Sequence, residues 1–118
     1  MKIIISANDK NPDSQINPRF ARCPWFLIYD DEAQTWDAID NSQSVNAARG
    51  AGIQAAQTIS DLGGNVVISG RIGPKAYRGL AAARVQIFIG AAGTVRQAVE
   101  DFKAGKLKKA SEADALGM

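Results

Sequence analysis

Hydrophobic residues come in short runs near the start of the chain, separated by polar loops. The runs at 3–7 and 25–29 predict two buried strands on either side of the long polar loop 8–24. A turn at 30–32 precedes the segment 35–39, whose mixture of polar and apolar positions is typical of an edge strand. We expect these three strands to form an antiparallel meander.

The hydrophobic period becomes helical after Asn41 and ends at Gly63 and Gly64, which are a stop signal. One face of this predicted helix carries small and apolar residues, namely Ala48, Gly52, Ala55, Ile59 and Leu62. Small side chains on this face allow the helix to pack closely on a sheet.

The rest of the chain alternates strands and helices. Segments 66–69 and 85–89 predict apolar strands, and segments 74–83 and 94–104 predict helices. Two strand-helix-strand units in series require parallel strands with right-handed crossovers. The sequence therefore predicts an α/β fold with a five-stranded mixed sheet, in which the first three strands are antiparallel and the last two are parallel.

The last predicted helix has marked ends. Thr94 and Gln97 fit a capping box at its start, and Gly105 fits a C-terminal stop. We expect a single domain over residues 1–105 and a flexible tail over residues 106–118.

Composition excludes several kinds of chemistry. The 118 residues suit one domain, and 46% hydrophobic with 22% charged residues is ordinary for a globular protein. Cys23 is the only cysteine and histidine is absent, which argues against disulfides, zinc sites and Ser-His or Cys-His catalysis. The net charge of +2, with no signal peptide or membrane-spanning run, predicts a cytoplasmic protein that binds neither nucleic acid nor membrane.

Charge is distributed unevenly along the chain. Asp61 is the one acid between Asp40 and Glu100, a stretch that has six cations. These cations are Arg49, Arg71, Lys75, Arg78, Arg84 and Arg96. The turn before the helix at 74–83 combines backbone N–H groups, a helix dipole and two cations, which suits an anion, although plain turn chemistry also explains its glycines. The residues of this turn are Gly70, Arg71, Gly73 and Lys75.

The predicted strand directions bring four loops together. If the first, third, fourth and fifth strands point the same way, the loops 8–24, 41–46, 69–73 and 90–93 lie at one edge of the sheet, where open α/β sheets bind ligands. These loops contain Asn17, Arg19, Arg22, Cys23, Asn46 and Arg71. Three helix N-termini would face the same edge, so this edge is a candidate anion site.

The first of these loops mixes guanidinium groups, an aromatic ring and a thiol. Arg19 and Arg22 can fork around a soft anion, Phe20 gives an apolar wall, and Cys23 offers a thiolate where nearby cations lower its pKa. The structural alternative is that Phe20 enters the core and leaves both arginines in water.

Arg49, Gly50 and Gly52 occupy the first turn of the preceding predicted helix. A cation opposes the helix dipole there and glycines weaken the helix. A negative ligand accounts for both costs, whereas close packing explains the glycines but not Arg49.

The acidic residues suggest a different chemistry, that of a metal-dependent nuclease. The acids that such a site would draw on are Asp9, Asp13, Asp30, Asp31, Asp37 and Asp40. The turn at 30–32 is predicted at the opposite edge of the sheet, and the late loops supply no acid, so we disfavour this function. Trp25 and Trp36 lie in predicted strands and are interpreted as packing residues.

Four segments, taken in order, resemble the dinitrogenase iron-molybdenum cofactor biosynthesis family, which includes NifX-type and NifB C-terminal domains and a small orange protein. The segments are 1–5, 17–26, 46–52 and 67–73. The similarity covers roughly residues 1–105 and is most specific in the arginine loop and the helix glycines.

The resemblance implies a ribonuclease H-like three-layer fold, without nuclease activity, that carries or delivers a preassembled metal-sulfur cluster. Members commonly show His-Phe-Gly-Arg where residues 18–22 of this chain read Pro-Arg-Phe-Ala-Arg, so a histidine ligand is excluded here. Noncovalent binding, as in the orange-protein branch, fits this sequence better.

We therefore expect a noncatalytic protein that binds or carries an anionic metal-sulfide cluster, of the molybdenum-copper or iron-molybdenum type, with recipient proteins as possible partners. The predicted cofactor-binding residues are Asn17, Arg19, Phe20, Arg22, Cys23, Asn46, Arg49, Gly50, Gly52, Gly70, Arg71, Gly73 and Lys75, with Cys23 as the candidate metal ligand. The alternative is a nucleotide or phosphometabolite binding module that uses the same cationic turns.

Overall fold

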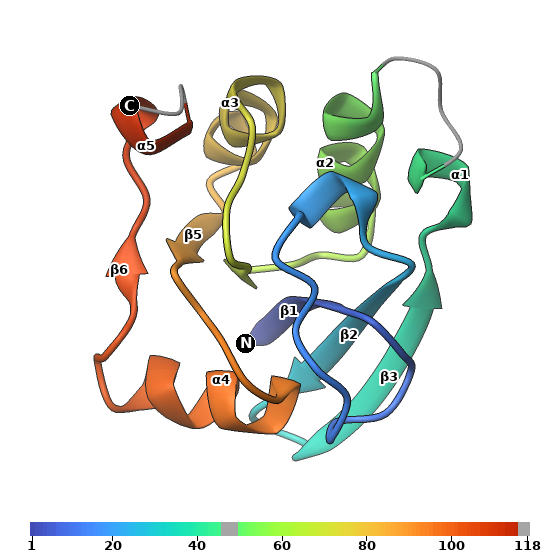
Figure 1. Ribbon diagram of the computed structural model, residues 1–118, viewed down its shortest axis with the longest axis vertical. Coiled ribbons are helices and arrows are strands. Elements are labelled where there is room, and N and C mark those ends of the chain that lie inside the picture. The colour runs from blue at the N-terminus through green and yellow to red at the C-terminus, as the bar shows by residue number, and fades with distance from the viewer. Residues whose placement is uncertain (46–49, 116–118) are drawn as a thin grey trace.

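A mixed β-sheet forms the middle layer of the protein (Figure 1). The computed structural model describes residues 1–45 and 50–115. Its strands are β1 (Lys2–Ala7), β2 (Trp25–Asp30), β3 (Thr35–Asp40), β4 (Val66–Ile68), β5 (Gln86–Ile89) and β6 (Lys108–Lys109). Its helices are the 3-10 helix η1 (Phe20–Arg22), α1 (Ser42–Val45), α2 (Ala51–Asp61), α3 (Pro74–Ala82), α4 (Val95–Lys103) and α5 (Glu112–Ala115). None of these described helices is long and apolar enough to cross a membrane.

The strands lie in the order β3-β2-β1-β4-β5-β6. β1, β2 and β3 form the antiparallel meander that the sequence predicts, and β4 and β5 continue the sheet parallel to β1. β6 was not predicted, and it pairs antiparallel with β5. The mixed α/β architecture is therefore confirmed, whereas the predicted count of five strands is wrong by one.

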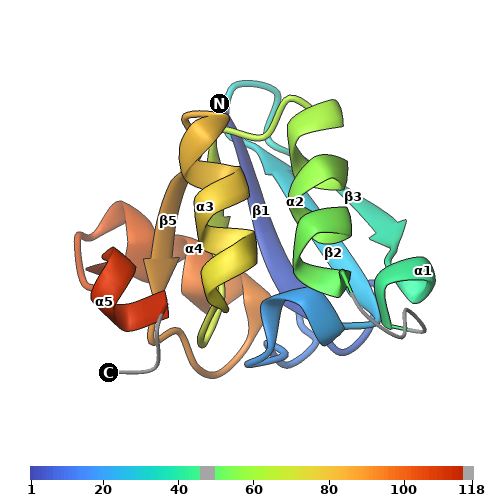
Figure 2. The ribbon, with the colours of Figure 1, turned by 90° about the horizontal axis from the view of Figure 1, so that it is seen from above.

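Apolar side chains on the two faces of the sheet form two cores. In β1, Ile4 belongs to the core under α2 and α3, whereas Ile3 and Ile5 belong to the core under α4. All three side chains are fully buried, because β1 lies inside the sheet with helices on both faces. Figure 2 shows α2 and α3 in front of the sheet and α4 behind it, so the protein has three layers.

Helices α2 and α3 pack against each other through small residues. A Cβ atom on Gly52 would lie 3.3 Å from Ala76 Cβ, and a Cβ atom on Gly79 would lie 3.0 Å from Ala56 Cβ. The small face that we expected to pack on the sheet thus also allows two helices to approach closely. Ala48, which the sequence assigns to the same face, lies outside the described residues.

The C-terminal segment forms β6 and α5, where the sequence predicts a flexible tail. Ala110 N donates a hydrogen bond to Ile87 O at 2.8 Å, next to the short β5–β6 ladder. Ala115 is buried in the core that α3 shares. Unpaired N–H and C=O groups along the edge of β5 favour this pairing even though the sequence of β6 is all lysine.

Helix α4 begins as the sequence predicts, with Thr94 as its N-cap. Thr94 Oγ1 accepts a hydrogen bond from Gln97 N at 3.1 Å. The Gln97 side chain does not complete the predicted capping box, because it donates to Asp101 Oδ1 at 2.9 Å instead.

Candidate functional site

Four strands end at the same edge of the sheet, as the strand directions predict. β1, β4 and β5 are parallel, and β3 runs in the same direction because β1 and β3 are both antiparallel to β2. Figure 2 shows the first turns of α2 and α3 at this edge and the N-terminus of the chain at the other. The loop after β1 supplies residues 17–20, the first strap, and the loop after β4 supplies residues 70–73, the second strap.

The two straps pair with each other through their backbones. Arg71 N donates to Pro18 O at 2.8 Å, and Phe20 N donates to Arg71 O at 3.4 Å. Gly70 makes this approach possible, since a Cβ atom at this position would lie 2.8 Å from Pro18 Cα. Gly70, which the sequence predicts to belong to a turn or an anion site, is therefore needed for the close contact between the straps.

Arg19 and Arg71 lie side by side on the paired straps. They form a parallel bridge, in which the side chains of the two partners point to the same side. Both side chains are exposed, and neither forms a salt bridge with any described residue. Because two like charges without an acid repel each other, an anion between these guanidinium groups is favourable.

A depression of about 350 Å³ opens beside these arginines. It is lined by Arg19, Phe20, Ala21, Arg22, Arg71, Ile72 and Gly73. We call this depression the crevice. Among the described residues that line it, the charged ones are all arginines. Sequence reasoning missed Ala21 and Ile72, whose only signal was their position between predicted site residues on the same loops.

Arg22 is the most constrained arginine of the crevice. It is half-buried, and its Nη1 donates to Ser44 O at 3.4 Å, which ties it to α1. The alternative that leaves both arginines of the loop in water is therefore correct for the exposed Arg19 and wrong for Arg22.

Phe20 lies in the core, so although it belongs to the crevice lining it offers almost no exposed surface there. Its side chain is 2% exposed, and the centroid of its ring is 5.2 Å from that of Phe26. Its ring enters the core under α2 and α3, as the structural alternative expects, because η1 directs it there, and its part in ligand binding stays a prediction.

Cys23 belongs to the same core and does not line the crevice. The thiol is fully buried, and its Sγ donates to Phe20 O at 3.1 Å. Burial raises the pKa of the Cys23 thiol to about 12, so the thiol stays protonated at neutral pH. Since metals bind the thiolate, this position does not support the expectation that Cys23 is a metal ligand.

Asn17 holds the first strap in shape. Its Oδ1 accepts a hydrogen bond from Arg19 N at 2.9 Å, and its Nδ2 donates to Asn8 Oδ1 at 2.9 Å. Both ends of the amide are occupied, so Asn17 fixes the backbone of Arg19.

The glycines at the start of α2 have conformational reasons. Gly50 is the N-cap with φ +79°, in the left-handed region that favours glycine. Gly52 lies against Ala76 of α3. The predicted start of this helix is therefore wrong, because α2 begins at Ala51 with Gly50 as its N-cap. Neither glycine requires a ligand to explain it.

Of the four remaining predicted site residues, the structure describes two, and one of these two lines the crevice. Gly73 is the N-cap of α3 and lines the crevice. Lys75 is exposed in the first turn of α3 and is not among the lining residues. Asn46 and Arg49 lie outside the described residues, so their part in the site stays a prediction.

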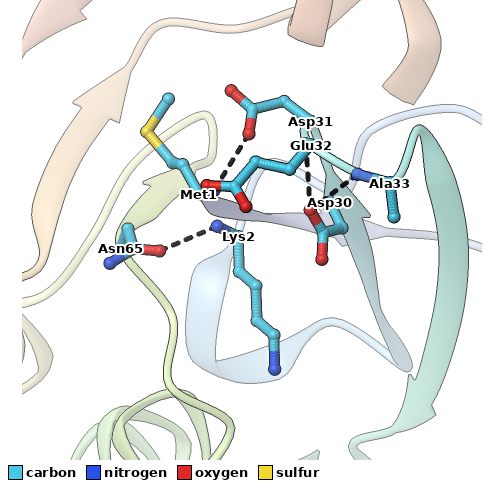
Figure 3. A network of polar contacts seen from close by, with 7 residues as sticks. All are labelled: Met1, Lys2, Asp30, Asp31, Glu32, Ala33 and Asn65. Atoms are coloured by element: carbon cyan, nitrogen blue, oxygen red, sulfur yellow. Dashed lines mark hydrogen bonds and ion pairs between the residues drawn. The ribbon is translucent and has the colours of Figure 1, made fainter.

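Several acids considered for a nuclease site lie at the opposite end of the sheet. Asp30 Oδ1 accepts hydrogen bonds from Glu32 N and Ala33 N in the β2–β3 turn, and these bonds lower the pKa of Asp30 (Figure 3). Asp31 Oδ1 pairs with the Met1 amine at 2.9 Å. Among the residues that the structure describes, no group of three His, Cys, Asp or Glu could hold a metal ion. These acids stabilise the turn and the chain start.

Comparison with known proteins identifies the family to which this chain belongs. The family model described as dinitrogenase iron-molybdenum cofactor matches residues 1–105. The chain therefore belongs to this family, as the four segments of the sequence predict.

Individual relatives agree with this assignment. The apo form of the orange protein from Desulfovibrio gigas is 34% identical, with a TM-score of 0.90 over 93% of this chain and 92% of that chain. A candidate NifB protein of the DUF35 family from Thermotoga is 30% identical, with a TM-score of 0.81 over 92% of this chain and 91% of that chain. An uncharacterised protein of Methanocaldococcus jannaschii is 28% identical over 100 residues, which are 82% of this chain and 84% of that protein.

Proposed function

We propose that this protein binds an anionic metal-sulfide cluster noncovalently in the crevice. The observation that carries the proposal is the bridge between Arg19 and Arg71, beside a depression of about 350 Å³ whose described lining holds no acid. Guanidinium groups are weakly hydrated and pair with large, soft anions. Ala21 and Ile72 add apolar surface, which suits sulfide better than a strongly hydrated oxyanion.

The groups that line the crevice support binding of a cluster whose metals already have their ligands. The described lining offers guanidinium and backbone groups but no thiolate, imidazole or carboxylate to a metal. Such a crevice fits an anion whose metals are already coordinated by sulfide. Family membership supports molybdenum in the cluster, and the resemblance to the orange-protein branch favours a molybdenum-copper sulfide over an iron-molybdenum cluster.

The protein is proposed to carry the cluster without catalysing a reaction. We interpret the three layers as a ribonuclease H-like fold in which the acids form turns and a cationic crevice stands at the ligand-binding edge of the sheet. Because the crevice lies at the surface, a bound cluster could pass to a recipient protein without unfolding of the carrier.

Replacing Arg19, Arg22 and Arg71 together by alanine tests the proposal. We expect the affinity for tetrathiomolybdate to fall at least about tenfold, because the charge-assisted contacts would be lost. Arg96→Ala is a control for each single substitution in this set, since it removes one arginine from an exposed position on α4, on the other face of the sheet. Equal loading of the triple variant and the wild type would sink the arginine mechanism.

The same crevice could instead take a phosphate compound, and thermal unfolding separates the two ligands. If the proposal is correct, tetrathiomolybdate raises the melting temperature and phosphate or nucleotides at similar concentration do not. Stabilisation by nucleotides alone would favour a phosphometabolite module.

A further inference from the structure

Two buried serines lie directly behind the straps. Ser6 is on β1, and Ser69 follows the last residue of the parallel strand β4. Both residues are fully buried, and their Oγ atoms are 2.8 Å apart. A buried hydroxyl is unfavourable unless it has a hydrogen-bond partner, so the bonds of this pair reveal what it holds.

The hydroxyl pair forms a directed chain of hydrogen bonds. Ser6 Oγ lies 2.7 Å from Asn17 O, and a carbonyl oxygen only accepts, so Ser6 is the donor. A hydroxyl has one proton, so the bond between the two serines must run from Ser69 to Ser6. Ser69 Oγ also lies 3.4 Å from Arg71 O. Because the Ser69 proton goes to Ser6, the contact with Arg71 O has no proton of its own. The pair therefore reaches the first strap at Asn17 and the second strap through the backbone of Ser69, which directly precedes Gly70.

Backbone bonds attach each strap to a neighbouring strand. Asn17 N donates to Ser6 O at 3.0 Å, which fixes the first strap to the end of β1. Ser69 N donates to Phe88 O at 3.0 Å, and Gly70 O accepts from Gly90 N at 3.0 Å, which fixes the start of the second strap beside β5. Each strap thus has its own anchor, and the hydroxyl pair joins the two anchors in the interior.

We propose that Ser6 and Ser69 are positioning residues of the crevice. Their hydroxyl pair sets the separation of the two straps and hence the spacing of Arg19 and Arg71, so that one anion contacts both guanidinium groups. The inference rests on the proposed function of the crevice, and it adds that anion affinity depends on two groups that do not touch the ligand.

The variants Ser6→Ala and Ser69→Ala test this role. We expect each to bind tetrathiomolybdate about threefold to tenfold more weakly, because the loss of one buried hydrogen bond loosens the straps. Hydrogen exchange at the Arg71 amide, which donates to Pro18 O, should be faster in both variants. Val99→Ala is the control, because Val99 is buried in the core under α4 and its loss should lower stability without changing either readout.

A double-mutant cycle distinguishes a positioning role of the serines from a purely structural one. In the wild type, the effects of Arg19→Ala and Arg71→Ala on affinity should be strongly non-additive, because both arginines hold the same anion. In the Ser69→Ala background, the two effects should become additive.

Unchanged affinity and unchanged Arg71 exchange in both serine variants would overturn the inference. If the wild type itself retains no tetrathiomolybdate, the proposed function fails, and hydrogen exchange alone decides the coupling of the straps. Faster Arg71 exchange in the serine variants, but not in Val99→Ala, would then support the coupling. Equal exchange in all variants would refute it.

Discussion

Gly70 is the residue on which the contact between the two straps depends. A Cβ atom at this position would lie 2.8 Å from Pro18 Cα and 3.0 Å from Pro18 O, so the backbones would have to separate. We expect Gly70→Ala to lower the free energy of unfolding by about 1–3 kcal/mol, as overpacking does, and to weaken anion binding. Urea unfolding followed by circular dichroism measures the change in stability.

Gly73→Ala is the matched control for this variant. Nothing lies within 4 Å of a Cβ atom at Gly73, and its φ of −80° is ordinary for any residue. Its stability should therefore stay close to that of the wild type. Equal destabilisation by the two substitutions would contradict the close contact at Gly70.

Cys23 provides a prediction about pH. Burial raises the pKa of its thiol from 9.0 to about 12 in the folded protein. Because the folded pKa is the higher one, the stabilising contribution is complete below about pH 9 and is lost as the pH rises towards about 12. The free energy of unfolding of the wild type should thus fall more steeply above pH 9 than that of Cys23→Ala.

Urea titrations at several pH values from 7 to 11 measure this difference. Parallel pH profiles of the two proteins would contradict the burial of the thiol. In the same comparison, Cys23→Ala should retain tetrathiomolybdate as well as the wild type does, whereas a loss of binding would return Cys23 to the site.

The site could be predicted from the sequence in part. The convergence of loops at one edge placed Arg19, Arg22 and Arg71 together, because strand direction follows from the order of elements. Composition could not tell that Phe20 and Cys23 face the core, since residue types do not say which side of the short helix η1 and of its C-cap, Cys23, turns inward.

At the scale of elements, the segment from β6 to α5 depends on Asp114. Its Oδ1 pairs with Lys108 Nζ at 2.9 Å, and its Oδ2 accepts from Ser111 N at 2.8 Å. These bonds, that from Lys108 first, lower the pKa of Asp114 from 3.8 to about 2. Because the folded pKa is the lower one, this stabilisation is present above about pH 4 and is lost as the pH falls towards 2.

We expect Asp114→Asn to loosen α5 at neutral pH and to remove the acid-dependent step seen in the wild type. Amide exchange at residues 112–115 measures this between pH 2 and 6. Glu112→Gln is the control, because the pair of Glu112 with Arg78 spans 3.5 Å between exposed side chains and contributes little. An α5 that is equally protected in Asp114→Asn and in the wild type would show that the ion pair does not hold it.

The elements with strong hydrophobic patterns were predictable, and the others were not. β1 and β2 are continuous apolar runs, and the glycines after α2 mark its end. β6 has no such pattern, since its two lysines pair only because β5 leaves an open edge. The start of α2 was misplaced because the left-handed conformation of the N-cap Gly50 depends on tertiary structure, which the helical period does not encode.

At the scale of the whole molecule, the two ends of the sheet have different chemistry. The end at the β2–β3 turn carries Asp30, Asp31 and Glu32, which hold the turn and the chain start together (Figure 3). The other end presents Arg19 and Arg71 in the crevice. An anion is therefore attracted to the crevice, where the described charged residues are all arginines.

The most direct test of cluster binding is an absorption spectrum of the purified protein after titration with tetrathiomolybdate, alone and then with copper, followed by gel filtration. The charge and shape of the crevice predict that a chromophore with stoichiometric molybdenum elutes with the protein. Colourless protein, with all the molybdenum in the salt fraction, would contradict the binding of a metal-sulfide cluster.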